Sequence, residues 1–304
     1  LGHVMTKHFI DFDNLSFEVL QDIIDHARAL KKQHNEGAIN NSLINKTLAM
    51  IFDKSSTRTR VSFEAGMAQL GGHALFLSNN DIQLGRGEPI TDSAIVISSM
   101  VDVVILRISS HEDIIEFSKH SNKPVINALS DLSHPCQILA DLMTYQEQRG
   151  SISGKKVAWI GDGNNVCQTY MQAAEIFGFE LTIASPNSYK PNQSFIENYQ
   201  NNINYCSNPM DACKDADLVV TDVWTSMGKE SEQKHRESAF KGYQVDQKMM
   251  SVTNSDALFM HCLPAHRGEE VSADVINGKQ SVVWDEAENR LHTQKALLLY
   301  LIEA

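Results

Sequence analysis

A dense group of hydroxyl and basic side chains follows the apolar run TLAMI, in the stretch FDKSSTRTR at residues 52–60. The apolar run predicts a buried strand, and the Ser and Thr residues after it are typical N-caps of a helix. Such a strand-to-helix turn directs backbone N–H groups and side-chain donors at one point. We interpret the stretch as an anion site for a phosphate group, and the alternative is a capped surface helix with solvated arginines. It is not a Walker loop, because the glycine-rich segment and the GK[ST] ending are absent.

Two further polar positions are expected at the same edge of the predicted sheet. The tetrapeptide HPCQ at residues 134–137 follows the predicted strand KPVINAL and starts a helix, and Arg107 lies near the end of the strand VDVVILR. Ligand sites in open α/β sheets lie beyond the carboxyl ends of the strands. A single histidine at such a place is more often structural than catalytic. Three converging strand ends favour a binding site.

Strand and helix patterns alternate along the chain, as a parallel α/β sheet requires. Before residue 134 we expect the helix NLSFEVLQDIIDHARALKKQ, a helix from SSTRTR to Gly71-Gly72, the helix HEDIIEFSKH, and the strands KTLAMIF, VDVVILRIS and KPVINAL. Ser133 and Pro135 predict the start of a linking helix that ends at Gly150. The second half offers the strands GKKVAWI, FELTIAS, DADLVVTDVW, DALFMHCLP and SVVWDEA, and then the helix ENRLHTQKALLLYLIEA, which we expect to pack back toward the first domain.

The length of 304 residues favours two domains of about 150 residues each. The predicted fold is α/β, with two Rossmann-like domains, each a mainly parallel sheet flanked by helices, joined by interdomain helices. The expected bounds are 5–133 for the first domain, 134–150 for the linking helix, 151–285 for the second domain and 286–304 for the C-terminal helix; the four residues before Met5 are left out.

Composition excludes several classes of function. The net charge of −12 argues against nucleic acid as a partner, since nucleic acid demands a basic face. No apolar run approaches the ~20 residues that cross a bilayer, so no membrane partner is expected. The five cysteines form no CxxC pair and predict a reduced, cytoplasmic chain rather than a disulfide framework or a zinc site; they are Cys136, Cys167, Cys206, Cys213 and Cys262.

Taken together, the motifs resemble a known family. STRTR followed by HPCQ looks like the carbamoyl phosphate signature of the aspartate/ornithine carbamoyltransferase family. The second half resembles its ornithine branch through GDGNN at 161–165, DVWTSMG at 222–228, HCLP at 261–264 and ENR at 288–290. The resemblance runs from about Lys7 onward with the motifs in the expected order. Each motif alone is weak, but the set is specific.

The resemblance implies two groups of site residues. The carbamoyl phosphate group is Ser56, Thr57, Arg58, Thr59, Gln83 (from a neighbouring subunit), Arg107, His134, Gln137, Cys262, Leu263 and Arg290. The ornithine group is Asn165, Asp222, Ser226 and Met227. The family pattern gives catalytic roles to Cys262, Arg107, His134 and Arg58.

The implied reaction is carbamoyl transfer to the δ-amine of ornithine, giving citrulline and phosphate in arginine metabolism. The resemblance implies no metal and no organic cofactor, and a homotrimer or a dimer of trimers. Positioned donors such as Arg58, Arg107 and His134 suit the negative charge that develops on the carbonyl oxygen and on the leaving phosphate. Asp222 suits the α-ammonium group of ornithine, and Cys262 is the family's proposed acceptor or guide for the proton of the amine.

Other interpretations remain open at this point. GDGNNV superficially suggests a dinucleotide fingerprint, but Val166 replaces the third glycine, so a nicotinamide cofactor is not expected. HCLPAHRGEEV could suggest a metal site, yet the His261–Cys262 adjacency and the step to His266 match no zinc pattern. Putrescine or aspartate could replace ornithine as the acceptor. A non-catalytic module that senses a phosphorylated metabolite is the alternative from another class.

Overall fold

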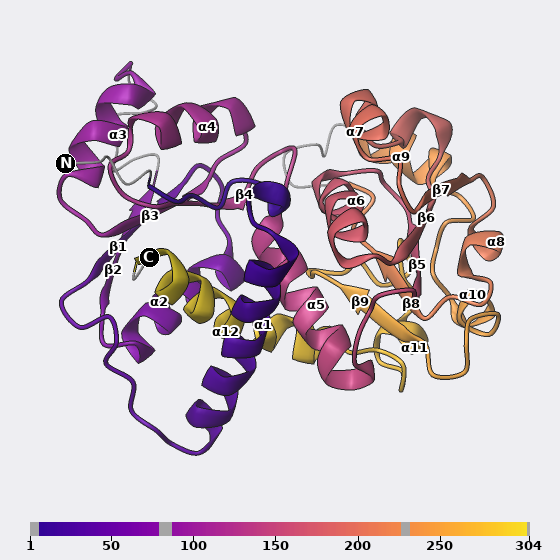
Figure 1. The fold of residues 1–304 in the computed structure, drawn as a ribbon. Helices are drawn as coiled ribbons and strands as arrows, with labels where there is room; N and C mark the ends of the chain where they lie inside the picture. The colour runs from indigo at the N-terminus through magenta and orange to yellow at the C-terminus, as the bar shows by residue number, and fades with distance from the viewer. Residues whose placement is uncertain (1–5, 79–86, 226–231, 303–304) are drawn as a thin grey trace. The chain divides into compact units, whose positions relative to one another are not determined.

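The computed structural model describes residues 6–78, 87–225 and 232–302 (Figure 1). The chain divides into two compact units. Unit 1 comprises Leu1–Met143 and Glu288–Ala304, and unit 2 comprises Thr144–Ala287. Among the described residues, no helix is both long and apolar enough to span a membrane.

Unit 1 contains a four-stranded parallel sheet in the order β2-β1-β3-β4 (Figure 1). Its elements in chain order are η1 (Phe12–Asn14), α1 (Phe17–Asn35), β1 (Thr47–Phe52), α2 (Thr57–Gln69), β2 (His73–Ser78), α3 (Ile90–Ser98), β3 (Val103–Arg107), α4 (His111–His120), β4 (Val125–Leu129) and the start of α5 (Pro135–Arg149). The central strands β1 and β3 are buried along almost their whole length and supply the core, together with Ile114 and Phe117 of α4.

Local sequence explains where the helices of unit 1 begin and which face they bury. In α1, Ser16 caps the start by accepting a hydrogen bond from the backbone N–H of Val19 at 3.4 Å. Its buried residues recur at the spacing of one helix face, namely Leu20, Ile23, Ile24, Ala27 and Leu30. Helix α1 therefore forms where its apolar pattern predicts it.

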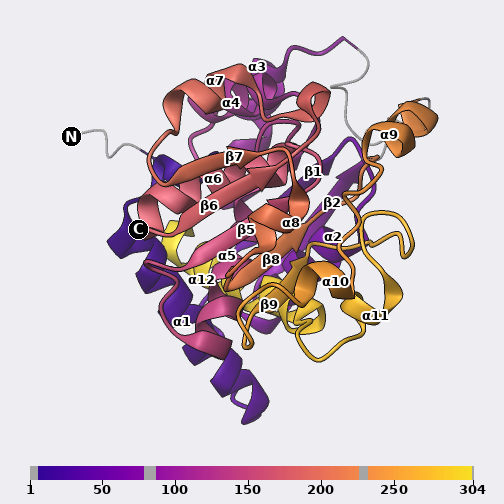
Figure 2. The same cartoon turned by 90° about the vertical axis from the view of Figure 1, so that its right-hand side faces the viewer.

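Unit 2 contains a five-stranded parallel sheet in the order β7-β6-β5-β8-β9, which Figure 2 shows in that sequence. Its elements are β5 (Lys156–Ile160), α6 (Asn165–Phe177), β6 (Glu180–Ala184), η3 (Asn187–Tyr189), α7 (Gln193–Asn198), β7 (Ile203–Cys206), α8 (Pro209–Cys213), β8 (Leu218–Thr221), α9 (Gln233–Ala239), α10 (Gln247–Met250), β9 (Leu258–His261), α11 (Ala273–Ile276) and the start of α12 (Val283–Ile302). Val219, Phe259 and Val275 lie in its core.

The prediction of a strand at SVVWDEA is wrong. Only Ser281 forms an isolated bridge, to Phe259 of β9, and the rest of the stretch from Val283 onward is the first turn of α12. The C-terminal helix therefore starts earlier than the predicted bound of residue 286. A short apolar run such as SVVW cannot be assigned to strand or helix by its periodicity alone.

Candidate active site

In unit 1, three strand ends meet at one edge of the sheet. The register pairs Phe52 at the end of β1 with Arg107 at the end of β3, and Arg107 in turn with Leu129 at the end of β4. The loops that follow these strands are also tied together, because the carboxylate of Asp53 accepts a hydrogen bond from the backbone N–H of Ser109 at 2.6 Å. The loops that carry the predicted polar residues therefore leave the sheet side by side, as the sequence analysis expected.

The STRTR stretch forms the N-terminus of α2. Ser56 is the N-cap, and its hydroxyl accepts a hydrogen bond from the backbone N–H of Thr59 at 3.3 Å. This geometry leaves the first N–H groups of a 13-residue helix at the carboxyl edge of the sheet. Helix N-termini of this kind favour negative charge, because unsatisfied N–H groups and the helix dipole act together.

Two buried arginines from different segments converge on Thr59. Its hydroxyl oxygen lies 3.3 Å from Nη1 of Arg107 and 3.4 Å from Nη2 of Arg290 on α12. Arg290 also donates through Nη1 to Oε1 of Gln137 at 2.7 Å, and Gln137 donates to Asp141 at 2.8 Å. These side chains are all almost completely buried. Two guanidinium groups thus share one hydroxyl oxygen inside unit 1, which creates a positive field there.

His134 lies within this positive field. Burial lowers the pKa of His134 well below its ordinary value, and the guanidinium groups of Arg290, Arg107 and Arg58 lower the pKa further. The imidazole is therefore neutral at physiological pH. A neutral imidazole between three cations can still donate one N–H to an oxygen that gains negative charge.

The basic residues of FDKSSTRTR do not form one cluster in the structure. Only Arg58 lies close enough to influence His134, whereas Arg60 pairs with Glu64 at 3.1 Å and its guanidinium lies 3.9 Å from the ring centroid of Phe76. Lys54 is 4.0 Å from a carboxylate oxygen of Asp131. The three basic residues of FDKSSTRTR therefore have separate partners.

A second cluster forms in unit 2 at the ends of β8 and β9. The register pairs Thr221 with His261, so the next residues, Asp222 and Cys262, follow neighbouring strand ends. The thiol of Cys262 donates to Oδ1 of Asp222 at 3.2 Å. Asp222 also accepts a hydrogen bond from the side-chain amide of Asn164 at 2.7 Å. A carboxylate and a thiol in contact suit an amine substrate, since the carboxylate attracts a cation and the thiol offers a site for a proton.

Asn164 is a residue that the sequence analysis missed. It is the N-cap of α6, and its side-chain oxygen accepts hydrogen bonds from the backbone N–H groups of Val166 and Cys167 at 3.0 and 3.1 Å. The same side chain holds Asp222, while the predicted ligand Asn165 accepts from Val166. The strong preference of helix N-caps for asparagine was the available signal.

The HCLP segment is shaped by a buried histidine. Nδ1 of His261 accepts a hydrogen bond from the backbone N–H of Leu263 at 2.9 Å, so Nε2 carries the proton and donates to Glu270 at 2.9 Å. Leu263 has a φ of 57°, a conformation that a leucine rarely adopts. Asp222, His261 and Cys262 bring one possible metal-ligand atom each to within 4.8 Å of one another, as do His266, Glu269 and Glu270. Both nitrogens of His261 are engaged by protein groups, which favours a shaped substrate loop over a metal site.

The GDGNN turn has a packing role in unit 2. A Cβ atom on Gly163 would lie 2.2 Å from the backbone nitrogen of Pro191, so only glycine fits. Asp162 in the same turn forms a buried ion pair with Arg236 at 2.5 Å. The glycine that suggested a nucleotide-binding fingerprint therefore permits the close approach of another loop.

Comparison with known proteins assigns both halves of the chain. The carbamoyl-P binding domain of aspartate/ornithine carbamoyltransferase matches residues 7–147, and the Asp/Orn binding domain matches residues 153–301. The chain belongs to the aspartate/ornithine carbamoyltransferase family. The family resemblance and the fold class that the sequence analysis predicted are thereby confirmed.

Individual carbamoyltransferases resemble this chain over nearly its whole length. The ornithine carbamoyltransferase of Ruthia magnifica is 65% identical over 298 residues, which cover 98% of this chain and 100% of that protein. The ornithine carbamoyltransferase of Hydrogenovibrio crunogenus is 60% identical over 296 residues, which cover 97% of this chain and 98% of that protein. The crystal structure of ornithine carbamoyltransferase from Burkholderia thailandensis is 50% identical with a TM-score of 0.91, covering 97% of this chain and 98% of that one. The ornithine carbamoyltransferase structure from Pyrococcus furiosus is 45% identical with a TM-score of 0.93, covering 98% of each chain.

Within the carbamoyltransferase fold, the structure brings several of the predicted residues together, and three others lie outside the described residues. Unit 1 brings together Thr59, Arg107 and Arg290, with Gln137 beside Arg290, and places Arg58 and His134 in the same field. Unit 2 brings together Asp222 and Cys262. Gln83, Ser226 and Met227 lie outside the described residues.

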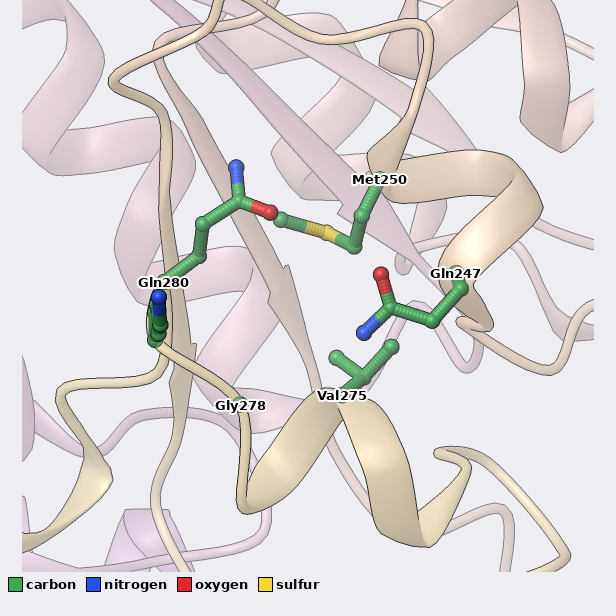
Figure 3. A pocket seen from close by; sticks show the side chains of 6 residues that line it. Gln247, Met250, Val275, Gly278 and Gln280 are labelled. Atoms are coloured by element: carbon green, nitrogen blue, oxygen red, sulfur yellow. The ribbon is translucent and has the colours of Figure 1, made fainter.

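A hollow elsewhere in unit 2 is not the candidate site. Figure 3 shows this hollow of about 240 Å³, which is lined by Gln247, Met250, Val275, Gly278, Lys279 and Gln280. None of the residues assigned to carbamoyl phosphate or ornithine lines it. Its lining contains neither the arginines that meet in unit 1 nor the carboxylate–thiol contact of Asp222 and Cys262.

Proposed function

We propose that this protein transfers the carbamoyl group of carbamoyl phosphate to the δ-amine of L-ornithine, giving L-citrulline and phosphate. The observation that carries the proposal is the buried meeting of Arg107 and Arg290 at Thr59, beside a neutral His134. A small phosphorylated donor with a polar carbonyl group matches this set of donors. The names of the relatives that match the whole chain support ornithine as the acceptor.

The donor site is proposed in unit 1. The N-terminus of α2 and Arg58 bind the phosphate, while Arg107 and His134 donate to the carbonyl oxygen, where negative charge develops. The full proposed set is Ser56, Thr57, Arg58, Thr59, Arg107, His134, Gln137 and Arg290, with Cys262, Leu263 and Gln83 as further contacts. The hydrogen bonds between Arg290, Gln137 and Thr59 support the set, because they hold these donors in place before a ligand arrives.

The acceptor site is proposed in unit 2. Asp222 binds the α-ammonium group of ornithine, and Asn165, Ser226 and Met227 complete the site. The δ-amine must be neutral to attack, since an ammonium nitrogen has no lone pair. Cys262 is placed to take or direct that proton, and its hydrogen bond to Asp222 supports this role.

The same proposal includes the wider setting of the reaction. The family resemblance supports a role in arginine metabolism and a homotrimer or dimer of trimers, and the unpaired cysteine pattern of the sequence supports a cytoplasmic location. The proposed domain bounds are 5–133, 134–150, 151–285 and 286–304, although α12 itself already begins at Val283. The boundary between the compact units falls inside α5, which supports a linking helix at 134–150.

The test is citrulline formation from carbamoyl phosphate with ornithine, run beside putrescine and aspartate as acceptors. Arg58→Ala should abolish turnover, because it removes a guanidinium group that is proposed to bind the phosphate group of the substrate. Arg60→Ala is the matched control, since this residue lies two positions along the same helix but contacts Glu64 and Phe76. Turnover on another acceptor would overturn the assignment of ornithine. Phosphate-dependent thermal stabilisation without turnover on any acceptor would favour a binding module.

A further inference from the structure

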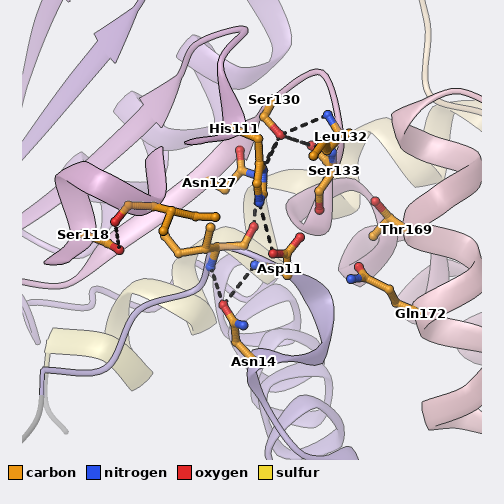
Figure 4. Close-up of polar contacts among 12 residues, drawn as sticks. Asp11, Asn14, His111, Ser118, Asn127, Ser130, Leu132, Ser133, Thr169 and Gln172 are labelled. Carbon is orange, nitrogen blue, oxygen red and sulfur yellow. Dashed lines mark hydrogen bonds and ion pairs between the residues drawn. The ribbon is translucent and has the colours of Figure 1, made fainter. Parts of the chain in front are cut away.

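The N-terminal segment pairs with the edge of the unit 1 sheet. The backbone N–H of Phe9 donates to Val125 at 2.9 Å, and the N–H of Asn127 donates back to Phe9 at 2.8 Å. The side chain of Asn127 then holds the carbonyl of Ile10 at 2.9 Å. These bonds fix the next residue, Asp11, beside the start of α4 (Figure 4).

Asp11, His111 and Ser130 form a hydrogen-bonded chain (Figure 4). Nε2 of His111 lies 3.2 Å from Oδ2 of Asp11, and Nδ1 lies 2.8 Å from the hydroxyl of Ser130. A carboxylate only accepts, so Nε2 is the donor toward Asp11. In the neutral imidazole Nδ1 is then the acceptor, and it receives the hydroxyl proton of Ser130. The carbonyl of Ser133 is a second acceptor for this hydroxyl at 3.4 Å, but Nδ1 of His111 at 2.8 Å is much nearer, so the chain directs the hydroxyl proton of Ser130 toward His111.

Ser130 in turn organises the loop that leads to His134. Its hydroxyl oxygen accepts from the backbone N–H groups of Leu132 and Ser133 at 3.3 and 3.2 Å. Its own N–H donates to the carbonyl of Ser133 at 2.9 Å. Ser133 directly precedes His134, whose carbonyl accepts from Gln137 in the first turn of α5 at 3.1 Å. The orientation of one hydroxyl therefore sets the backbone immediately before His134, whose carbonyl is in turn bonded to Gln137.

We propose that His111 is a positioning residue for the carbamoyl phosphate site. By accepting the hydroxyl proton of Ser130, it orients that hydroxyl so that its oxygen accepts from the backbone at 132–133, and this fixes His134 and Gln137. The inference rests on the proposed function, because it assigns a role in binding the donor of that reaction. His111 itself touches no substrate; it acts through Ser130.

Two substitutions test the contacts of the two His111 nitrogens one at a time. His111→Asn places an amide oxygen at the position of Nδ1, so it keeps an acceptor for the hydroxyl of Ser130. His111→Gln places its amide group at the position of Nε2, so it keeps only the contact with Asp11. We expect His111→Gln to raise KM for carbamoyl phosphate about tenfold, because small misplacements of donor groups are costly. His111→Asn should stay within about twofold of the wild type. KM for ornithine should not change in either variant.

His120→Gln is the matched control, because it changes an exposed histidine at the other end of the same helix. Ser130→Ala should reproduce the KM pattern of His111→Gln, and the double variant should be no worse than Ser130→Ala alone. This second variant keeps the test decisive if His111→Gln does not fold. Equal effects of Asn and Gln at position 111, a parallel rise in KM for ornithine, or additive effects in the double variant would overturn the proposal.

Thermal stabilisation by inorganic phosphate tests the role of His111 even if the proposed function is wrong. If the wild type shows no turnover but is stabilised by phosphate, the reaction assignment fails and the positioning role is judged by phosphate affinity. His111→Gln should then lose phosphate affinity about tenfold relative to His111→Asn. Equal phosphate affinity in the two variants would refute the positioning role.

Discussion

The acid stability of the protein should depend strongly on His292. This residue lies on α12 and is completely buried, with its ring centroid 5.8 Å from that of His34. Burial lowers the pKa of His292 from 6.5 to about 3, and the charges of Lys295, Lys31 and His34 act in the same direction. A carboxylate oxygen of Glu288 at 3.8 Å would favour the protonated form, but these effects outweigh it.

The sign of the effect follows from the pH at which the folded and the unfolded state each bind the proton. The folded imidazole stays neutral down to about pH 3, whereas the unfolded one takes up a proton near pH 6.5. Well above pH 6.5 both states are neutral, so His292 contributes no pH dependence there. As the pH falls from 6.5 toward 3, the unfolded state binds more protons and the free energy of unfolding decreases. At pH 5 the loss is about 2 kcal/mol relative to pH 7. A folded-state pKa of about 4 would give nearly the same loss, since it also lies well below 5.

His292→Gln removes this proton uptake, because glutamine is neutral at every pH. Between pH 7 and pH 5 the free energy of unfolding decreases in both proteins. The decrease should be about 2 kcal/mol smaller in His292→Gln than in the wild type. Urea denaturation at both pH values measures the difference. Leu298→Val is the control, since it alters a buried residue of α12 that cannot titrate and should lower stability equally at both pH values. If His292→Gln kept the wild-type pH dependence, the folded imidazole would have to be protonated, and the reasoning would be wrong.

Three more predictions concern the turn after β5. Asn164→Ala should cost about 1 kcal/mol of stability and raise KM for ornithine. Asn164→Asp keeps the cap but sets a second carboxylate against Asp222, so it should raise KM for ornithine and also lower Tm, and a wild-type KM in both variants would contradict the role of Asn164. Gly163→Ala should destabilise unit 2 by about 1–3 kcal/mol in urea denaturation, and an unchanged midpoint would contradict the observed close contact. Asp162→Asn leaves Arg236 buried without its carboxylate, so thermal unfolding should show a loss of about 3–5 kcal/mol; wild-type stability would mean that the pair is solvated.

Buried strands and amphipathic helices were the parts of the fold that the sequence predicted well. The run VDVVILR became β3 because its apolar, β-branched residues suit a strand that is covered on both faces. The edge strands β2 and β7 were missed, since each is only partly buried and mixes polar with apolar residues. The failure at SVVWDEA has a tertiary cause as well. Glu286 in the first turn of α12 accepts the backbone N–H of His261, a contact that no local pattern reveals.

Candidate site residues were predictable where topology gathers strand ends. Arg107 and His134 follow from that rule, because parallel strands bring their carboxyl ends to one edge. Arg290 does not, since it lies 231 positions from Thr59 and reaches it from the last helix. Spacing carries no information about a contact of that range, so only the family resemblance implied it. Asn164 was missed because its two roles, as helix cap and as partner of Asp222, become visible only when both strands are placed.

The net charge of the whole chain does not predict the charge of one site, and the arginines of α2 show why. Successive helix positions are rotated by about 100°, so Arg58 and Arg60 point in nearly opposite directions. Arg60 turns to Phe76 and Glu64, while Arg58 joins Arg107 and Arg290 around His134. A net charge of −12 therefore does not prevent a strongly positive interior site. Because burial, reinforced by those three cations, keeps His134 neutral, the proposed mechanism has its N–H donate to the developing oxyanion while the guanidinium groups supply the charge that the imidazole does not carry.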